Sequence, residues 1–109
     1  MGKETLLSLA TRFFKDRGYT IEHHLKYEGF SGLLHTFDLL VRKGKMERVI
    51  FVMDWKRTVG INMIMKAEKA SKDVGFAHPI IISKRFSDHA KAYSNKKRIT
   101  LMTMRELLP

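Results

Sequence analysis

Residues 49–57, VIFVMDWKR, determine how the chain is interpreted, because five apolar residues run directly into an acid, a tryptophan and two bases. Side chains alternate along a strand, so Val52, Asp54 and Lys56 share one face. Trp55 lies on the other face, where packing under a helix is expected rather than base stacking. The stretch predicts a buried strand that ends with an acid and a base side by side.

Two further strands are predicted immediately before this one. Residues 33–42 form a strand, and the tight turn KGK at 43–45 joins it to the strand at 46–56. Apolar and polar residues alternate within 19–26 well enough for a strand with one solvent-exposed face. The two glycines within 27–32 indicate a loop. Short connections predict that these three strands pair antiparallel.

Three amphipathic helices are predicted from apolar stripes with clear boundary signals. They cover residues 3–17, 61–74 and 87–95. Gly18 and Gly75 end the first two, and Ser87 can cap the third. Short strands at 78–83 and 98–103 and a helical turn at 104–108 complete the chain.

The predicted order α-β-β-β-α-β-α-β-α indicates the α/β class. The last three strands are separated by helices, so they should be parallel with right-handed crossovers. A mixed sheet with helices on both faces follows. No linker or repeat interrupts residues 1–109, so a single domain is expected.

The composition points to a polyanionic partner. The 109 residues include 21 bases and 11 acids, for a net charge of +10. Nucleic acid is the first candidate and an anionic membrane surface the second, whereas a merely solvated basic surface is the alternative. No apolar run reaches the ~18 residues of a membrane span. The absence of cysteine fits a reducing cytosol, so a cytoplasmic location is expected.

A second acid, Asp38, lies in the strand at 33–42. Counting outward from the turn at 43–45 places Asp38 opposite roughly residue 50, a few residues short of Asp54, unless a bulge shifts the register. The alternative is that Asp38 forms an ion pair with Lys56, or with Arg42 or Arg57.

Converging carboxylates would repel each other unless a cation lies between them. Carboxylate and water oxygens are the ligands that Mg²⁺ prefers, and Mn²⁺ is the expected substitute. Lys56 would point toward the same spot, where its ammonium can orient an attacking water. A divalent ion, a lysine and a basic surface together indicate phosphodiester hydrolysis.

Three stretches resemble the PD-(D/E)xK nuclease superfamily and, within it, the Mrr-like restriction endonuclease family. They are SGLLHTFDLLV at 31–41, FVMDWKR at 51–57, and residues 59–107 with the pattern F-S-x-x-A-x-x-Y at 86–93. The resemblance implies a restriction-endonuclease-like fold and a magnesium-dependent endodeoxyribonuclease that acts on DNA. It also implies that Asp38 and Asp54 hold the metal and that Lys56 is catalytic.

The resemblance departs from the family in two places. Phe37 stands where relatives usually have a proline before the first aspartate. A glutamate that many relatives carry in the first helix would fall near Leu7 or Ser8, and Glu4, about a turn earlier, is the candidate to replace it.

Other residues are weaker candidates. His35 precedes Asp38 by three residues, so a structural role is favoured over a phosphate contact. Ser31 and the amides of Gly29 and Gly32 could donate to phosphate oxygens. The candidate basic contacts to nucleic acid are Arg57, Lys84, Arg85, Lys96, Lys97 and Arg98.

The leading hypothesis is therefore an endonuclease, expected to be a homodimer because cleaving both strands of a duplex needs two sites. One alternative is a non-catalytic, basic nucleic-acid-binding module that keeps the nuclease fold. A nuclease of the Holliday-junction-resolvase type differs only in the shape of its substrate.

Overall fold

The computed structural model describes residues 5–108. Its helices are α1 (Leu6–Asp16), α2 (Ile61–Asp73), α3 (Asp88–Lys97) and α4 (Met104–Leu107). Its strands are β1 (Thr20–Glu28), β2 (Leu34–Lys43), β3 (Met46–Met53), β4 (Ile80–Ser83) and β5 (Thr100–Met102). No helix in this part of the chain is both long and apolar enough to cross a membrane.

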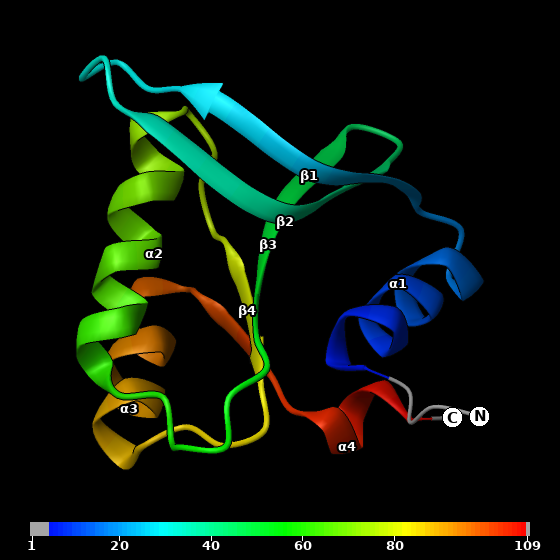
Figure 1. Cartoon of the computed structure of the whole chain (residues 1–109), viewed down its shortest axis with the longest axis vertical. Helices are drawn as coiled ribbons and strands as arrows, with labels where there is room; N and C mark the ends of the chain where they lie inside the picture. The colour runs from blue at the N-terminus through cyan, green and yellow to red at the C-terminus, as the bar shows by residue number, and fades with distance from the viewer. Residues whose placement is uncertain (1–4, 109) are drawn as a thin grey trace.

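The five strands form one mixed sheet in the order β1-β2-β3-β4-β5. β1, β2 and β3 pair antiparallel, whereas β3, β4 and β5 pair parallel. Helices α1 and α4 cover one face of the sheet, and α2 and α3 cover the other (Figure 1). The predicted class, element order and strand directions are confirmed.

The predicted boundary signals act as expected. Gly18 and Gly75 have left-handed φ values of 87° and 85°, conformations that an L side chain adopts only with strain. They follow α1 and α2 closely. The Ser87 hydroxyl accepts a hydrogen bond of 3.1 Å from the Ala90 amide, which caps α3.

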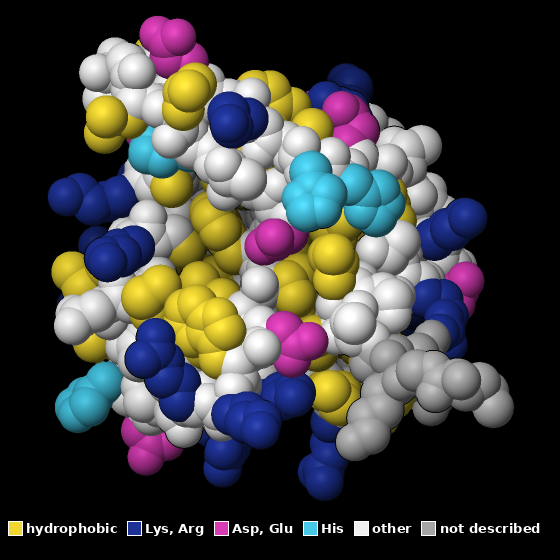
Figure 2. Space-filling view, viewed as in Figure 1, with side chains coloured by type: hydrophobic (Ala, Val, Ile, Leu, Met, Phe, Trp, Pro, Cys, Tyr) yellow, Lys and Arg dark blue, Asp and Glu magenta, His cyan; other side chains and the backbone are white. Residues whose placement is uncertain are grey.

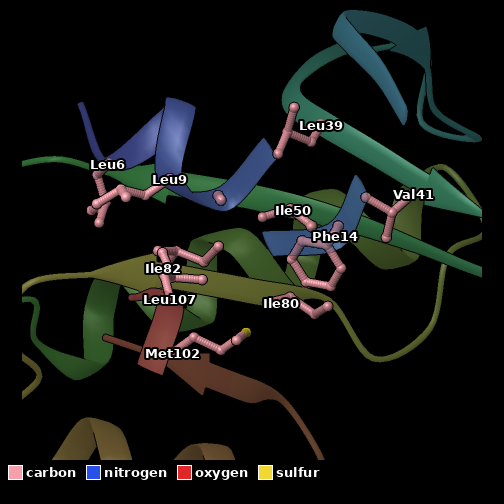
Figure 3. Close-up of a cluster of buried hydrophobic side chains, with 11 residues drawn as sticks. Leu6, Leu9, Phe14, Leu39, Val41, Ile50, Ile80, Ile82, Met102 and Leu107 are labelled. Carbon is pink, nitrogen blue, oxygen red and sulfur yellow. The ribbon is translucent and has the colours of Figure 1, made fainter. Parts of the chain in front are cut away.

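The core on the α1 face combines apolar side chains from α1, the sheet and α4. Figure 3 shows Leu6, Leu9 and Phe14 of α1 over side chains of the sheet. The sheet and α4 contribute Leu39, Val41, Ile50, Ile80, Ile82, Met102 and Leu107. Burial of these side chains fixes α1 across the middle of the sheet.

A second layer of apolar side chains lies under α2 and α3. Ile64 and Ala90 pack there against Ile81 of β4. An aromatic cluster extends this layer beneath the β1–β2 hairpin, where the fully buried Phe37 contacts Phe51, with ring centroids 5.2 Å apart. The two layers together bury both faces of the parallel part of the sheet.

The predicted end of the third strand is wrong by three residues. β3 ends at Met53, so Asp54, Trp55 and Lys56 lie in the connection to α2 rather than in the strand. The sheet pairing stops there because β3 has already reached the end of β4, where Met53 pairs with Ser83. Trp55 packs against the α2–α3 layer, as the sequence predicts.

A buried carboxylate joins α2 to α3. The Tyr93 hydroxyl donates to Glu68, and Lys72 lies 3.4 Å from the other Glu68 oxygen. Burial raises the pKa of Glu68, but the Tyr93 hydroxyl and the Lys72 ammonium outweigh it and lower the pKa overall. A carboxyl group with a lowered pKa stabilises the fold above its unfolded pKa, and this contribution is lost as pH falls through the folded value.

We expect Tyr93→Phe to lower the Tm by a few degrees at pH 7 and by less at pH 3. At neutral pH the substitution removes a hydrogen bond to an ionised acceptor, whereas at low pH the acceptor is neutral. Tyr19→Phe is the matched control, because the Tyr19 hydroxyl donates to the uncharged Met46 sulfur, at 3.7 Å. Equal losses at the two pH values would contradict the assigned role of Glu68.

Candidate active site

Asp54 lies directly after β3 and is held by the start of α1. Its Oδ2 accepts a hydrogen bond of 3.1 Å from the backbone amide of Leu6. The first amides of a helix have no partner within the helix, and the helix dipole favours a carboxylate there. The packing of α1 on the sheet therefore fixes the position of this acid.

Asp38 is half-buried in β2, and its carboxylate is bonded to the neighbouring strand β3. Its Oδ2 accepts a hydrogen bond of 2.7 Å from the backbone amide of Val52. The ladder between β2 and β3 ends where Leu39 pairs with Ile50, so the carboxylate takes the place of a main-chain acceptor just beyond it.

The strand is irregular at this point. Phe37 packs with Leu40, whereas Leu39 faces the α1 core, so strict alternation fails around Asp38. His24, which lies opposite on β1, has a left-handed φ of 49° and interrupts the β1–β2 pairing. The predicted partner near residue 50 is therefore off by one or two residues, in the direction of Asp54.

Both acids therefore lie near the end of β3: Asp38 is bonded to Val52 within the strand, and Asp54 follows Met53 directly. Asp54 follows Val52 by two residues, which is roughly 6.6 Å along an extended chain. Among residues 5–108, Asp38 forms none of the ion pairs considered from the sequence, and Arg42 contacts Glu22 and lies 2.5 Å from Glu47 instead. The face of the molecule drawn in Figure 2 has acidic side chains near its middle, with Lys and Arg side chains mostly toward its edges.

Two lysines accompany these acids. Lys56 is exposed and forms no ion pair within residues 5–108, and its carbonyl accepts a 2.9 Å bond from Arg85. Lys84 follows β4, and its Nζ lies 3.5 Å from Asp54 Oδ1. The sequence suggested Lys84 only as a phosphate contact. The position of Lys84 beside Asp54 could have been inferred from the predicted sheet, because neighbouring parallel strands end side by side, here at Met53 and Ser83.

The candidate basic residues do not form one patch. Arg57, Lys84 and Arg85 lie in the connections that follow β3 and β4, and Lys84 contacts Asp54. The other three, Lys96, Lys97 and Arg98, end α3 just before β5 begins. The amide of Thr100 donates to the carbonyl of Pro79, so this second group lies where β4 and β5 start, at the opposite end of these parallel strands.

Asp73, at the end of α2, binds two of the weaker candidates. The Ser31 hydroxyl donates to its Oδ2 at 2.6 Å, and the Ser31 amide donates to Oδ1 at 3.0 Å. His35 Nε2 lies 2.7 Å from the same Oδ2. The Ser31 hydroxyl and then His35 lower the pKa of Asp73. Both donors of Ser31 are thus engaged within the chain, and His35 has a structural partner.

Within residues 5–108 no group of three His, Asp or Glu side chains is arranged to hold a metal ion. Glu4, the additional ligand suggested by the sequence, lies outside the described residues. Asp38 and Asp54 are therefore the two metal-ligand candidates that the structure describes at this strand end.

The mixed sheet with helices on both faces defines a restriction-endonuclease-like fold. The profile of the Mrr_cat family, described as restriction endonuclease, matches residues 1–109, and the chain belongs to this family. The resemblance stated from the sequence is confirmed. None of the curated proteins matches the chain in sequence.

Three solved structures share the fold. AF1548, a protein of unknown function, superposes with a TM-score of 0.83 at 18% identity, over 92% of this chain and 61% of its own. VC1899 from Vibrio cholerae gives 0.68 at 13% identity, over 94% and 29%. A repair endonuclease from Pyrococcus abyssi gives 0.56 at 12% identity, over 94% and 47%. The chain spans less than two thirds of the length of each.

Proposed function

We propose that this chain is a metal-dependent DNA endonuclease that hydrolyses phosphodiester bonds. The observation that carries the proposal is that Asp38 is bonded to Val52 near the end of β3 and that Asp54 follows this strand directly, with Lys56 two residues further along. Membership of a restriction endonuclease family supports it. The net charge of +10 supports DNA as the substrate.

The donor set fits a hard divalent cation. Mg²⁺ is typically held by one or two carboxylates and keeps several waters, so Asp38 and Asp54 suffice as protein ligands. Within residues 5–108, Asp38 Oδ1 has no hydrogen-bond partner, which leaves it available. Glu4 is a candidate third ligand. When bound, Mg²⁺ or Mn²⁺ would supply charge neutralisation at a phosphate and a water of lowered pKa.

The remaining side chains would position the substrate. Lys56 follows Asp54 by two residues and forms no ion pair within residues 5–108, so it would orient the attacking water and offset charge on the phosphate oxygens. Arg57 and Arg85 are exposed next to it and would contact flanking phosphates. Leu6 would keep Asp54 in place through its backbone amide.

Nicking of a supercoiled plasmid tests the proposal. Wild-type protein should cut with Mg²⁺ or Mn²⁺ and stop cutting in EDTA, and Lys56→Ala should lose the activity. Lys45→Ala is the matched control, because Lys45 is an exposed lysine in the β2–β3 turn, at the far end of β3. Wild-type protein that cuts no better than Lys56→Ala would remove the enzymatic proposal.

A homodimer acting on duplex DNA follows from the same proposal, because one site cuts one strand at a time. Sedimentation of the protein would report the dimer directly. A junction-resolving nuclease would use the same residues on a branched substrate, so cleavage of a four-way junction in preference to a duplex would favour that variant.

One observation favours a non-catalytic nucleic-acid-binding module. Asp54 is already bonded to the Leu6 amide and lies near Lys84, so both of its oxygens have partners without a metal. The affinity of this module for DNA would fall steeply with salt concentration. Binding would persist in EDTA and in the Asp54→Ala variant. Strictly Mg²⁺-dependent binding would argue against it.

Lys84 should compete with the metal for Asp54. We expect Lys84→Gln to tighten Mn²⁺ binding about two- to fivefold, the range of a partly exposed ion pair. Titration of the DNA-free protein with Mn²⁺, followed by the signal of the free ion, measures this. Lys45→Gln controls for the loss of one positive charge. Unchanged or weaker binding in Lys84→Gln would mean that Asp54 does not hold the ion.

A further inference from the structure

The tip of the β1–β2 hairpin exposes large apolar side chains. Phe30 is 89% exposed, Leu33 64% and Leu34 62%. Single exposed apolar residues are ordinary, but three within five residues form a patch. Figure 1 shows this tip reaching past the end of α2, away from both core layers.

The tip is held in one conformation despite its exposure. The Gly29 amide donates to the Leu33 carbonyl at 2.8 Å, and the Phe30 amide donates to the Asp73 carbonyl at 2.8 Å. The Asp73 carboxylate also accepts both donors of Ser31. The end of α2 therefore fixes the backbone on both sides of the Phe30 ring.

Two glycines are required for this arrangement. A Cβ at Gly29 would collide with the Asp73 carboxylate, so the loop approaches α2 as closely as a backbone can. Gly32 has a φ of 89°, which a side chain would strain. The sequence thus builds a rigid platform that presents an aromatic ring to solvent.

Lysines line the same side of α2. Lys66, Lys69 and Lys72 border a groove of about 610 Å³, together with Phe30 and Leu33. Lys72 is engaged with Glu68 at 3.4 Å. Lys66 and Lys69 form no ion pair within the described part of the chain, so their charges are available to a ligand.

We propose that this groove binds unpaired nucleotides, with one base stacked on Phe30 and the adjacent phosphates on Lys66 and Lys69. An exposed aromatic ring beside a row of cations is the combination that binds single strands, because every base presents a face for stacking. In a continuous duplex those faces are covered by neighbouring bases. The lysines favour a polyanion over an apolar protein partner.

The groove is placed to act with the proposed active site. Asp38 follows Leu34 by four residues along β2, which is roughly 13 Å at strand spacing. That span corresponds to about four base steps of 3.4 Å. The inference rests on the proposed function only for this link to cleavage: the enzyme would prefer DNA that is unpaired a few nucleotides from the cut.

Binding in EDTA tests the site without catalysis. The probes are a fluorescein-labelled 20-nucleotide oligothymidine and a labelled 20-base-pair duplex, followed by anisotropy. Phe30→Ala should weaken single-strand binding about 5- to 150-fold, as expected for the loss of one stacked base, and change duplex binding less than about twofold. Phe30→Tyr should restore single-strand binding, since it keeps an aromatic face.

Two matched controls separate stacking and charge from general effects. Leu108→Ala removes another exposed apolar side chain, 51% exposed and beyond α4, and should not change binding. Lys66→Gln with Lys69→Gln should reduce the slope of log affinity against log salt by about 1.4 on the single strand. The double variant Lys45→Gln, Lys91→Gln removes two positive charges elsewhere. It should reduce the slope by less than the variant at Lys66 and Lys69 does.

Three results would overturn the inference: wild-type single-strand affinity in Phe30→Ala, equal losses on single strand and duplex, or a Phe30→Ala change in sedimentation of the DNA-free protein. The last would show that the tip contacts a second copy of the chain. Failure here is distinguishable from failure of the nuclease proposal. An inactive protein can still need Phe30 for single-strand binding, and an active one can bind without it.

Discussion

Asp54→Asn is expected to lower the rate of divalent-dependent DNA cleavage by roughly two to three orders of magnitude. Asparagine keeps the size of the side chain, and its carbonyl oxygen can still accept the Leu6 amide that holds Asp54 at 3.1 Å. The substitution therefore removes charge with little change of position. Initial rates of plasmid nicking in Mg²⁺ measure the loss.

Asp38→Asn should have a similar effect for the same reason, because its oxygen can still accept the Val52 amide. Asp88→Asn is the matched control: Asp88 is an exposed acid in the first turn of α3, so it too is a carboxylate at a helix start. Asp54→Asn protein that cuts at the wild-type rate would exclude this acid from the reaction. Thermal unfolding of each variant confirms that it is folded.

Phe37→Ala should lower the free energy of unfolding by about 3–5 kcal/mol. Phe37 is fully buried, and its ring lies 5.2 Å from that of Phe51, 6.2 Å from that of Tyr27 and 6.5 Å from that of Phe76. The truncation leaves a cavity bordered by three rings, which cannot all move inward. Such a loss is a large fraction of the 5–15 kcal/mol typical of a small domain.

Urea denaturation measures this loss. Phe30→Ala is the matched control, since it deletes the same ring at a position that is 89% exposed, and it should change stability by less than about 0.5 kcal/mol. A loss below about 1 kcal/mol in Phe37→Ala would mean that the aromatic cluster does not hold β2 over α2.

The element order and strand directions could be predicted because the sequence patterns are local. The apolar stripe of α1 ends at a glycine, and the four buried residues of β4 read as a parallel strand from their composition alone. The hairpin between β2 and β3 follows from its short turn at Gly44, whose φ is 61°. Each signal lies within a few residues of the element that it specifies.

The site could be predicted only in part, because its geometry depends on long-range pairing. The position of Asp38 relative to β3 depends on a break in strand alternation that no local pattern marks, and on His24, which lies across β1. The ion pair between Lys84 and Asp54 needs the register of two parallel strands. The binding of Ser31 by Asp73 joins residues 42 positions apart.

The basic surface shows the same limit. Composition predicts a polyanionic partner, but it could not predict that Lys84 contacts Asp54 while Lys96 and Lys97 lie toward the opposite end of the parallel strands. Only the direction of α3, which returns the chain to the start of β5, separates the two groups. We therefore assign the first group to the proposed cleavage site.

The central claim is that the carboxylates of Asp38 and Asp54 bind one divalent ion. A crystal of the protein soaked in Mn²⁺, examined by the anomalous signal of manganese, tests it most directly. The claim requires a peak in contact with both carboxylates, with Lys84 displaced from Asp54. A well-soaked crystal with no peak there, and with Lys84 still on Asp54, would contradict it.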